Sequence, residues 1–305
     1  MAVNQSATQK STLSTPEELQ QAREYFKDND ILLTPPIMRA AYSDRMAWLL
    51  SSMSHLAYDK FEDKENPKTY ELFVAKLASG GFKLIATFNS DKTDTQAFLA
   101  ANGDFAVLAF RGTEVTKKKD VITDVAATQI SVLEGRVHRG FRDAYESVRE
   151  EIEASLSQLD NKIPLYITGH SLGAALATIA TQELDSKPQF RDRIAACYTF
   201  GSPRVGNSQY DKSFKAPIYR MVNTTDIVTV IPLLAMGYIH IGDIRFLGRK
   251  QGDFRRQIPI VLRALLFVAA LFRLFGPWVG DHAIVEYRRK LEAIAEKRNA
   301  VLHRQ

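Results

Sequence analysis

The stretch from Ile163 to Thr181 constrains the fold most, because it combines the patterns of a strand, a tight turn and a helix in immediate succession. The apolar run that ends at Ile167 is typical of a buried strand, and the Ala- and Leu-rich run that begins at Leu172 suits a buried helix. Between them stands Gly-His-Ser-Leu-Gly, residues 169–173. This succession is the context in which a Gly-x-Ser-x-Gly turn exposes its serine.

The two glycines of this pentapeptide, Gly169 and Gly173, allow a turn that is too sharp for side chains at its flanks. Such a turn pushes the Ser171 hydroxyl outward, and the helix that follows directs its N-terminus at the same point. We therefore predict that Ser171 is a nucleophile and that the Leu172 N–H is one donor to an oxyanion. The alternative is that the glycines only serve a tight strand–helix turn.

Length and composition bound the domain organisation. The chain has 305 residues, of which 45% are hydrophobic and 25% are charged, as in a globular protein. We expect a disordered start over residues 1–16, which are rich in Ser, Thr and Gln, and a single domain over residues 17–305. The start lacks the apolar core of a signal peptide, so we expect a cytoplasmic or peripheral membrane location.

Several kinds of chemistry have no support in the sequence. It contains no Cys-x-x-Cys pair, no His pair at metal spacing and no phosphate-binding glycine loop, so we expect no metal and no cofactor. The single cysteine, Cys197, excludes an internal disulfide. The net charge of +5 is mild, and we expect no nucleic-acid partner.

The elements upstream of the serine follow from local patterns. The patterns predict a helix that begins near Thr15, a long amphipathic helix over residues 37–58, strands over 72–74, 82–88 and 105–110, and an amphipathic helix over 141–159. The run 105–110 is unbroken and apolar, as in a central strand. It ends in Arg-Gly-Thr-Glu, and a Gly-containing turn there can direct a backbone N–H at the nucleophile. Thr113 is therefore the second predicted oxyanion donor.

A serine nucleophile needs a base, and the base needs a carboxylate that orients it. Asp226 follows the predicted strand Ile218–Asn223 by three residues. Catalytic groups lie just past the carboxyl ends of strands in an open parallel sheet. We therefore predict that Asp226 is the acid, with Asp243 and Asp281 as alternatives.

Six histidines compete for the role of the base. His282 lies in the loop that opens the predicted C-terminal helix, residues 283–301, and a histidine on such a loop can swing over Ser171. We predict His282 as the base, and His240 stays an alternative. His55 and His138 are interpreted as structural.

The chain resembles the class 3, or fungal-type, lipase family. The matching motifs are Phe110-Arg-Gly-Thr113, His138-x-Gly-Phe141, Gly169-His-Ser-Leu-Gly-Ala-Ala-Leu-Ala177, Thr199-Phe-Gly-Ser-Pro-Arg-Val-Gly-Asn207, Asn223-x-x-Asp226-x-Val228-x-x-x-Pro232, Gly237-Tyr-x-His240-x-Gly242 and Asp281-His282-x-x-x-x-Tyr287. They occur in order and together are highly specific.

The resemblance implies an α/β-hydrolase fold, in which helices flank a central, mostly parallel sheet. It implies a triad of Ser171, Asp226 and His282, an oxyanion hole formed by Thr113 and Leu172, and a lipid ester as the substrate, hydrolysed without a cofactor. His240 is then a family position outside the triad. The alternatives are a phospholipase A-type enzyme that acts on anionic membranes and a catalytically idle, lipase-like membrane-binding or interaction module.

Two segments depart from the family pattern. Residues 114–124 correspond in position to the lid of the family, which is often apolar. In this chain the segment contains three consecutive lysines, 117–119. We expect a lid-like loop, which is either a solvated surface segment or a basic flap that contacts a lipid surface.

The second departure is a long apolar segment before the catalytic histidine. Residues 256–276 are predicted to form an amphipathic helical insertion, on which Arg256, Arg263 and Arg273 share one narrow polar sector. The pattern fits an interfacial or lid helix, a helix packed on the protein with its arginines outward, or an oligomer contact. Residues 117–119 and 256–275 are therefore candidates for a peripheral membrane or lipid-surface contact.

Overall fold

The structure is a computed structural model of the chain, and it describes residues 14–26, 30–37, 41–63, 65–112, 128–132, 134–223, 226–232, 236–248, 252–256 and 282–302. The strands are β1 (Lys83–Ser90), β2 (Thr95–Ala101), β3 (Ala106–Phe110), β4 (Gln129–Val132), β5 (Gly135–His138), β6 (Leu165–His170), β7 (Ile194–Phe200), β8 (Ile218–Asn223), β9 (Asp243–Leu247) and β10 (Phe254–Arg255). The helices are α1 (Pro16–Arg23), α2 (Asp30–Leu33), α3 (Asp44–Leu56), α4 (Pro67–Ser79), α6 (Arg139–Ser157), α7 (Leu172–Asp185), α8 (Pro188–Arg191), α9 (Ser208–Asp211) and α12 (Ile284–Leu302), with a 3₁₀ turn over Ile227–Val230.

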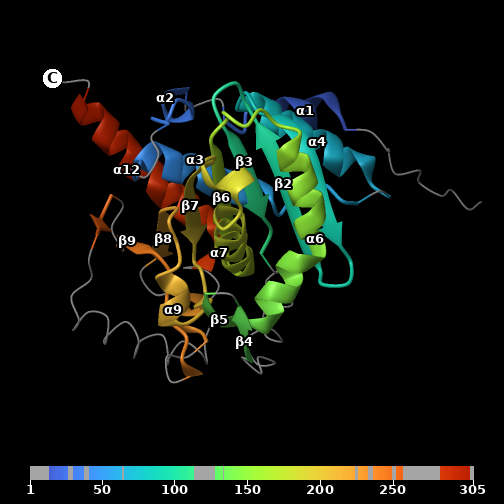
Figure 1. Cartoon of the computed structure of the whole chain (residues 1–305). Coiled ribbons are helices and arrows are strands. Elements are labelled where there is room, and N and C mark those ends of the chain that lie inside the picture. Colours follow the sequence, from blue (N-terminus) through green and yellow to red (C-terminus); the bar gives the residue numbers. More distant parts are fainter. Residues whose placement is uncertain are drawn as a thin grey trace, which may run out of the picture.

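An eight-stranded sheet in the order β1-β2-β3-β6-β7-β8-β9-β10 organises the described residues (Figure 1). Five strands of this sheet, β3, β6, β7, β8 and β9, pair in parallel, whereas β1, β2 and β10 join antiparallel at the two edges. Because parallel strands end at the same edge, the residues that follow β3, β6, β7 and β8 meet there. β4 and β5 form a separate two-stranded sheet.

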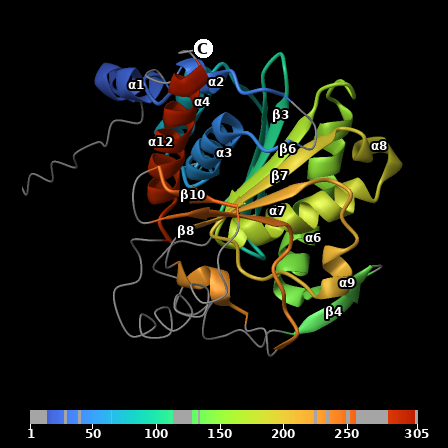
Figure 2. The same cartoon turned by 90° about the vertical axis from the view of Figure 1, so that its left-hand side faces the viewer.

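Helices cover both faces of the sheet, as Figure 2 shows, with α3, α4 and α12 on one side and α6 and α7 on the other. A hydrophobic core lies on each face of the sheet. Phe98 of β2 packs in the core on the side of α3 and α12, with Trp48 and Tyr287, whereas its neighbour Leu99 packs in the core on the side of α6 and α7, with Ile167. Successive side chains of a strand point to opposite faces, so β2 supplies both cores. This is why β3 is a continuous apolar run with every residue buried.

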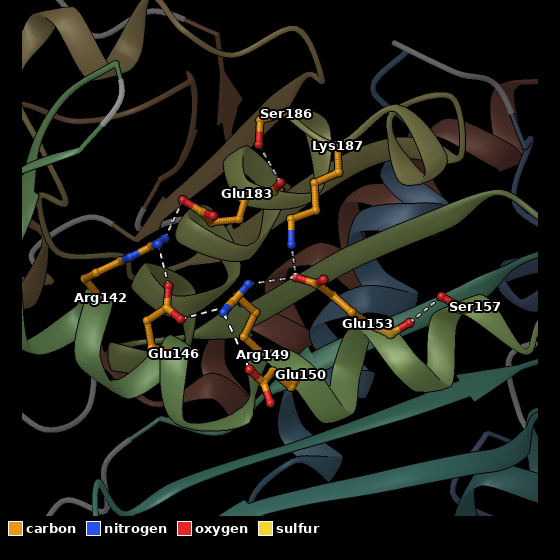
Figure 3. A network of polar contacts seen from close by, with 9 residues as sticks. All are labelled: Arg142, Glu146, Arg149, Glu150, Glu153, Ser157, Glu183, Ser186 and Lys187. Carbon is orange, nitrogen blue, oxygen red and sulfur yellow. Dashed lines mark hydrogen bonds and ion pairs between the residues drawn. The ribbon is translucent and has the colours of Figure 1, made fainter.

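Ion pairs join α6 to α7 and to the start of the segment that leads to α8 (Figure 3). Arg142 pairs with both Glu146 and Glu183, and Glu153 accepts from Lys187 at 2.5 Å. A single half-exposed pair contributes roughly 0–1 kcal/mol, but a network that shares partners holds its members together. The network therefore ties α6 to the helix that begins directly after Ser171.

Most elements appear where the sequence predicted them, and two predictions were wrong. Residues 72–74 belong to α4 and not to a strand, because a short apolar triplet also fits one face of a helix. The predicted helix over residues 37–58 begins only at Asp44, where the Ser43 hydroxyl accepts a hydrogen bond from the Met46 N–H at 3.2 Å.

Other predictions lie outside the described residues. They are the start of the chain up to residue 13, the lid-like loop over residues 114–124 and, apart from Arg256, the helical insertion over residues 256–276. Within the described part of the chain, no helix has the length and apolarity needed to cross a membrane.

Candidate active site

The turn between β6 and α7 holds Ser171 in a strained conformation. Its backbone has φ 58° and ψ −126°, a region that residues other than glycine rarely adopt. A Cβ atom on Gly169 would lie 2.2 Å from the carbonyl oxygen of Gly173, and one on Gly173 would lie 2.4 Å from that of Phe110. Both glycines are therefore required by close backbone contacts, as the sequence pattern predicted.

The structure brings Ser171, His282 and Asp226 into one hydrogen-bonded line. The Ser171 Oγ lies 2.8 Å from His282 Nε2, and His282 Nδ1 lies 2.8 and 2.9 Å from the two carboxylate oxygens of Asp226. The three side chains are buried, with exposed fractions of 5%, 1% and 3% in that order. Because Nδ1 faces a carboxylate, it carries the hydrogen, which leaves Nε2 free to accept the serine proton.

Strand and helix ends place these groups. Asp226 lies three residues beyond β8, and His282 lies two residues before α12, so both reach the edge where β6 ends. Gly201 follows β7 with φ +58°, and a Cβ atom there would lie 2.6 Å from Asp226 Oδ2 and 3.0 Å from His282 Nδ1. A glycine at this position leaves the space that the acid and the base occupy.

Helix α12 also supplies side chains that hydrogen-bond to Asp226 and to the end of β8. The Tyr287 hydroxyl donates to Asp226 Oδ2 at 2.6 Å and accepts from the Asn223 N–H at 3.0 Å. Burial, reinforced by the Asp226 charge, raises the pKa of Tyr287 well above its usual range, so the phenol stays a donor. The buried Lys290 ammonium donates to Asn223 Oδ1 at 2.6 Å and to the Gly248 carbonyl at 2.8 Å.

The sequence patterns do not predict these supporting roles. Tyr287 enters the sequence analysis only as part of a family motif, and Lys290 belongs to none of the motifs. A signal existed, because Lys290 lies one helical turn beyond Tyr287 and beside the buried Leu291, so it faces the protein interior.

Of the two predicted oxyanion donors, one lies among the residues that the structure describes. Leu172 is the first residue of α7, so its N–H belongs to the free N-terminus beside Ser171. Thr113 lies outside the described residues. The residue before it, Gly112, lies against the serine turn, since a Cβ atom there would be 3.1 Å from Ser171 Cβ.

The alternative residues lie elsewhere. Asp243 is exposed at the amino end of β9, where it pairs with Tyr219 of β8, away from the carboxyl edge. His240 lies in the loop before β9, and Asp281 lies outside the described residues. His138 stacks on Phe141 with a centroid distance of 4.2 Å. Among the residues that the structure describes, no three His, Cys, Asp or Glu side chains could hold a metal ion.

Comparison with known proteins shows which family of sequences the chain is similar to. Residues 107–236 match the family model described as Lipase (class 3). The chain is 34% identical to secreted mono- and diacylglycerol lipase A of Penicillium cyclopium, over 50% of this chain and 52% of that protein. It is 32% identical to a lipase of Rhizomucor miehei, over 54% of this chain and 48% of that protein. The chain thus spans about half the length of the curated relatives it matches.

Solved structures show the same fold. The Rhizomucor miehei lipase propeptide complex superposes with a TM-score of 0.57 at 26% identity, over 70% of this chain and 72% of that one. Lipase II from Rhizopus niveus gives a TM-score of 0.61 at 21% identity, over 88% of this chain and 94% of that one. The predicted α/β-hydrolase fold, with its mostly parallel sheet flanked by helices, is confirmed.

Proposed function

Because the chain belongs to the class 3 lipase family of the α/β-hydrolase superfamily, we propose that it is a serine hydrolase that cleaves the carboxylic ester bonds of lipids. The hydrogen-bonded line of Ser171, His282 and Asp226 carries this proposal. The names of the curated relatives, which are acylglycerol lipases and lipases, support acylglycerols as the substrate class.

The geometry supports a two-step reaction through an acyl-enzyme. Ser171 Oγ attacks the ester carbonyl while His282 Nε2 takes its proton, and the same nitrogen then protonates the leaving alcohol. Water attacks the acyl-enzyme in the second step, again with His282 as the base. Asp226 holds the imidazole in the required tautomer and stabilises its charged form.

We propose that the Leu172 N–H stabilises the negative oxygen of the tetrahedral intermediate, together with Thr113. Support for Leu172 comes from its position at the N-terminus of α7, where the helix dipole favours negative charge. Support for Thr113 comes from the sequence. Removing one such donor typically costs about 2.7–4 kcal/mol of transition-state stabilisation.

The test is hydrolysis of p-nitrophenyl esters from acetate to palmitate by the wild type and Ser171→Ala. We expect activity on medium or long chains that the substitution abolishes, because no other group replaces the nucleophile. Ser54→Ala is a matched control, since this buried serine bonds to Thr168 and not to the triad, and it should stay active. An inactive wild type would favour the idle binding module, and an active Ser171→Ala would contradict the triad assignment.

We also propose that the enzyme works as a peripheral protein at a lipid surface, through residues 117–119 and 256–275. The support is the lysine run and the one-sided arginines of the sequence. Sedimentation with vesicles of phosphatidylglycerol or of phosphatidylcholine tests it. Stronger binding to the anionic vesicles, lost when the three lysines become Glu, is the expected result. Release of fatty acid from these vesicles, but not from emulsified acylglycerol, would identify a phospholipase instead.

A further inference from the structure

His170 precedes the nucleophile in the chain and lies beside the base in space, and both of its ring nitrogens make polar contacts. Nε2 lies 2.6 Å from the backbone carbonyl oxygen of His282, and Nδ1 lies 2.7 Å from the Tyr58 hydroxyl. A carbonyl oxygen can only accept, so Nε2 carries the hydrogen and donates it. In the neutral ring Nδ1 is then the acceptor, and the Tyr58 hydroxyl donates to it. The His170 side chain is 2% exposed, and its ring lies 4.6 Å from the ring of His282.

The carbonyl group of His282 lies outside the hydrogen-bond ladder of α12 and is held by a side chain. The N–H groups of Glu286 and Tyr287 both donate to the Ala283 carbonyl, so the hydrogen-bond ladder of α12 starts one residue after His282. The carbonyl of His282 accepts from His170. The side chain of His282 is held at Nδ1 by Asp226, and the bond from His170 gives the residue a second fixed point on its main chain.

Tyr58 belongs to the turn after α3, and this turn also holds the end of β3. The Arg111 guanidinium donates to the Ala57 carbonyl and the Asp59 carbonyl, each at 2.5 Å, and pairs with the Glu62 carboxylate. A Cβ atom on Gly112 would lie 2.3 Å from the Tyr58 hydroxyl oxygen and 2.4 Å from the His170 carbonyl oxygen. One turn therefore contacts both the serine turn and the segment that leads to Thr113.

We propose that Tyr58 and His170 are positioning residues that hold the general base at its working distance from the nucleophile. Tyr58 orients the His170 ring, and the ring fixes the main chain of His282, so that Nε2 of His282 stays 2.8 Å from Ser171 Oγ. The inference rests on the proposed serine hydrolase function. A misplacement of about 1 Å in such a constellation can cost roughly 100-fold in rate, which makes a second anchor consequential.

The chain offers a matched control for Tyr58→Phe. The Tyr25 hydroxyl lies 2.9 Å from His55 Nδ1, so a second partly buried tyrosine–histidine pair involves the end of the same helix, α3. Among the described residues, none of the hydrogen bonds or ring contacts of Tyr25 reaches the triad. Tyr25→Phe removes the contact with His55 and also the hydrogen bond that the hydroxyl donates to the Ser52 carbonyl at 3.2 Å, so it reports what at least as large a loss of hydrogen bonds does to stability alone.

The experiment measures kcat and KM for p-nitrophenyl butyrate, the thermal unfolding midpoint, and the rate at which a fluorophosphonate probe labels Ser171. We expect Tyr58→Phe to lower kcat and the labelling rate by about 10-fold, with KM within about 2-fold, because only the placement of the base changes. Tyr25→Phe should lower the unfolding midpoint at least as much as Tyr58→Phe does and leave both rates unchanged. His170→Leu should lose about 100-fold in kcat, and His170→Gln, whose amide can donate to the His282 carbonyl, should recover part of it.

Equal kcat and labelling rates in wild type, Tyr58→Phe and Tyr25→Phe would overturn the inference, as would a loss confined to KM. Failure of the proposed function is distinguishable from this result. A wild type that hydrolyses no ester would contradict the hydrolase proposal. Probe labelling would then still decide the positioning role, because slower labelling of Tyr58→Phe supports it, and equal labelling or none overturns it.

Discussion

Replacing Tyr287 by Phe removes one hydroxyl group from the buried support of Asp226 and leaves the ring in place. That hydroxyl donates to Asp226 Oδ2 at 2.6 Å and accepts from the Asn223 N–H at 3.0 Å. The carboxylate keeps its bonds to His282 Nδ1 and to the Val228 N–H. The substitution therefore weakens the setting of the acid without dismantling the triad.

Two costs follow from these contacts. A hydrogen bond to a charged group contributes about 1.5–3 kcal/mol, and a buried N–H left without an acceptor costs about 1–3 kcal/mol. The two losses share one hydroxyl and do not simply add, so we expect the free energy of unfolding to fall by about 2–4 kcal/mol.

The sign of the pH effect follows from the direction of the lost dipole. The Tyr287 O–H points its positive end at the carboxylate, which opposes a positive charge on the neighbouring imidazole. Its removal favours the protonated base, so the acidic limb of the kcat/KM profile should move to higher pH. The energy of the lost hydrogen bond, about 1.5–3 kcal/mol, sets the ceiling on this effect, so the limb moves by no more than about 2 pH units.

The assay is the pH profile of kcat/KM for a soluble p-nitrophenyl ester, together with urea unfolding at neutral pH. Tyr145→Phe is the control, because the buried Tyr145 hydroxyl has no hydrogen-bond partner among the described residues. We expect this control to keep its stability and its pH profile. An acidic limb of Tyr287→Phe that stays in place or moves to lower pH would refute the reasoning.

Two further predictions concern the acid–base contact and acid stability. Gly201→Ala should lower kcat by roughly 100-fold with little change in KM, because the added methyl group would overlap Asp226 Oδ2; wild-type kcat in a folded variant would contradict this. Burial, with a smaller effect of the Arg288 charge, lowers the pKa of His55 from 6.5 to about 4, so the unfolded chain takes up a proton between these values and the folded chain does not. Titration of His55 should therefore remove up to about 3 kcal/mol of stability from the wild type as the pH falls from 6.5 to 4. His55→Gln, which cannot titrate at this position, should lose correspondingly less in urea unfolding over that range, and equal losses would refute the assignment.

Local patterns were sufficient wherever neighbouring residues decide the structure. The turn around Ser171 was predictable because its two glycines, the preceding apolar strand and the following helix lie within a few positions of one another. The position of Asp226 was predictable because it lies three residues beyond a strand that ends at the carboxyl edge. The triplet 72–74 failed for the same physical reason, since a run so short has no period that separates a strand from a helix.

The sequence by itself determined the nucleophile turn and the strands that end beside it, because each is specified by residue types at short spacing. It also placed Asp226 and His282 at element ends but left Asp243, Asp281 and His240 as alternatives, and the tertiary structure brought Asp226 and His282 to Ser171. The tertiary structure alone decided which distant side chains support them. Tyr287 reaches Asp226 across 61 residues, and Tyr58 reaches His170 across 112 residues. These bonds depend on how α3 and α12 pack on the sheet, and no local pattern encodes the direction in which a buried hydroxyl points once two elements meet.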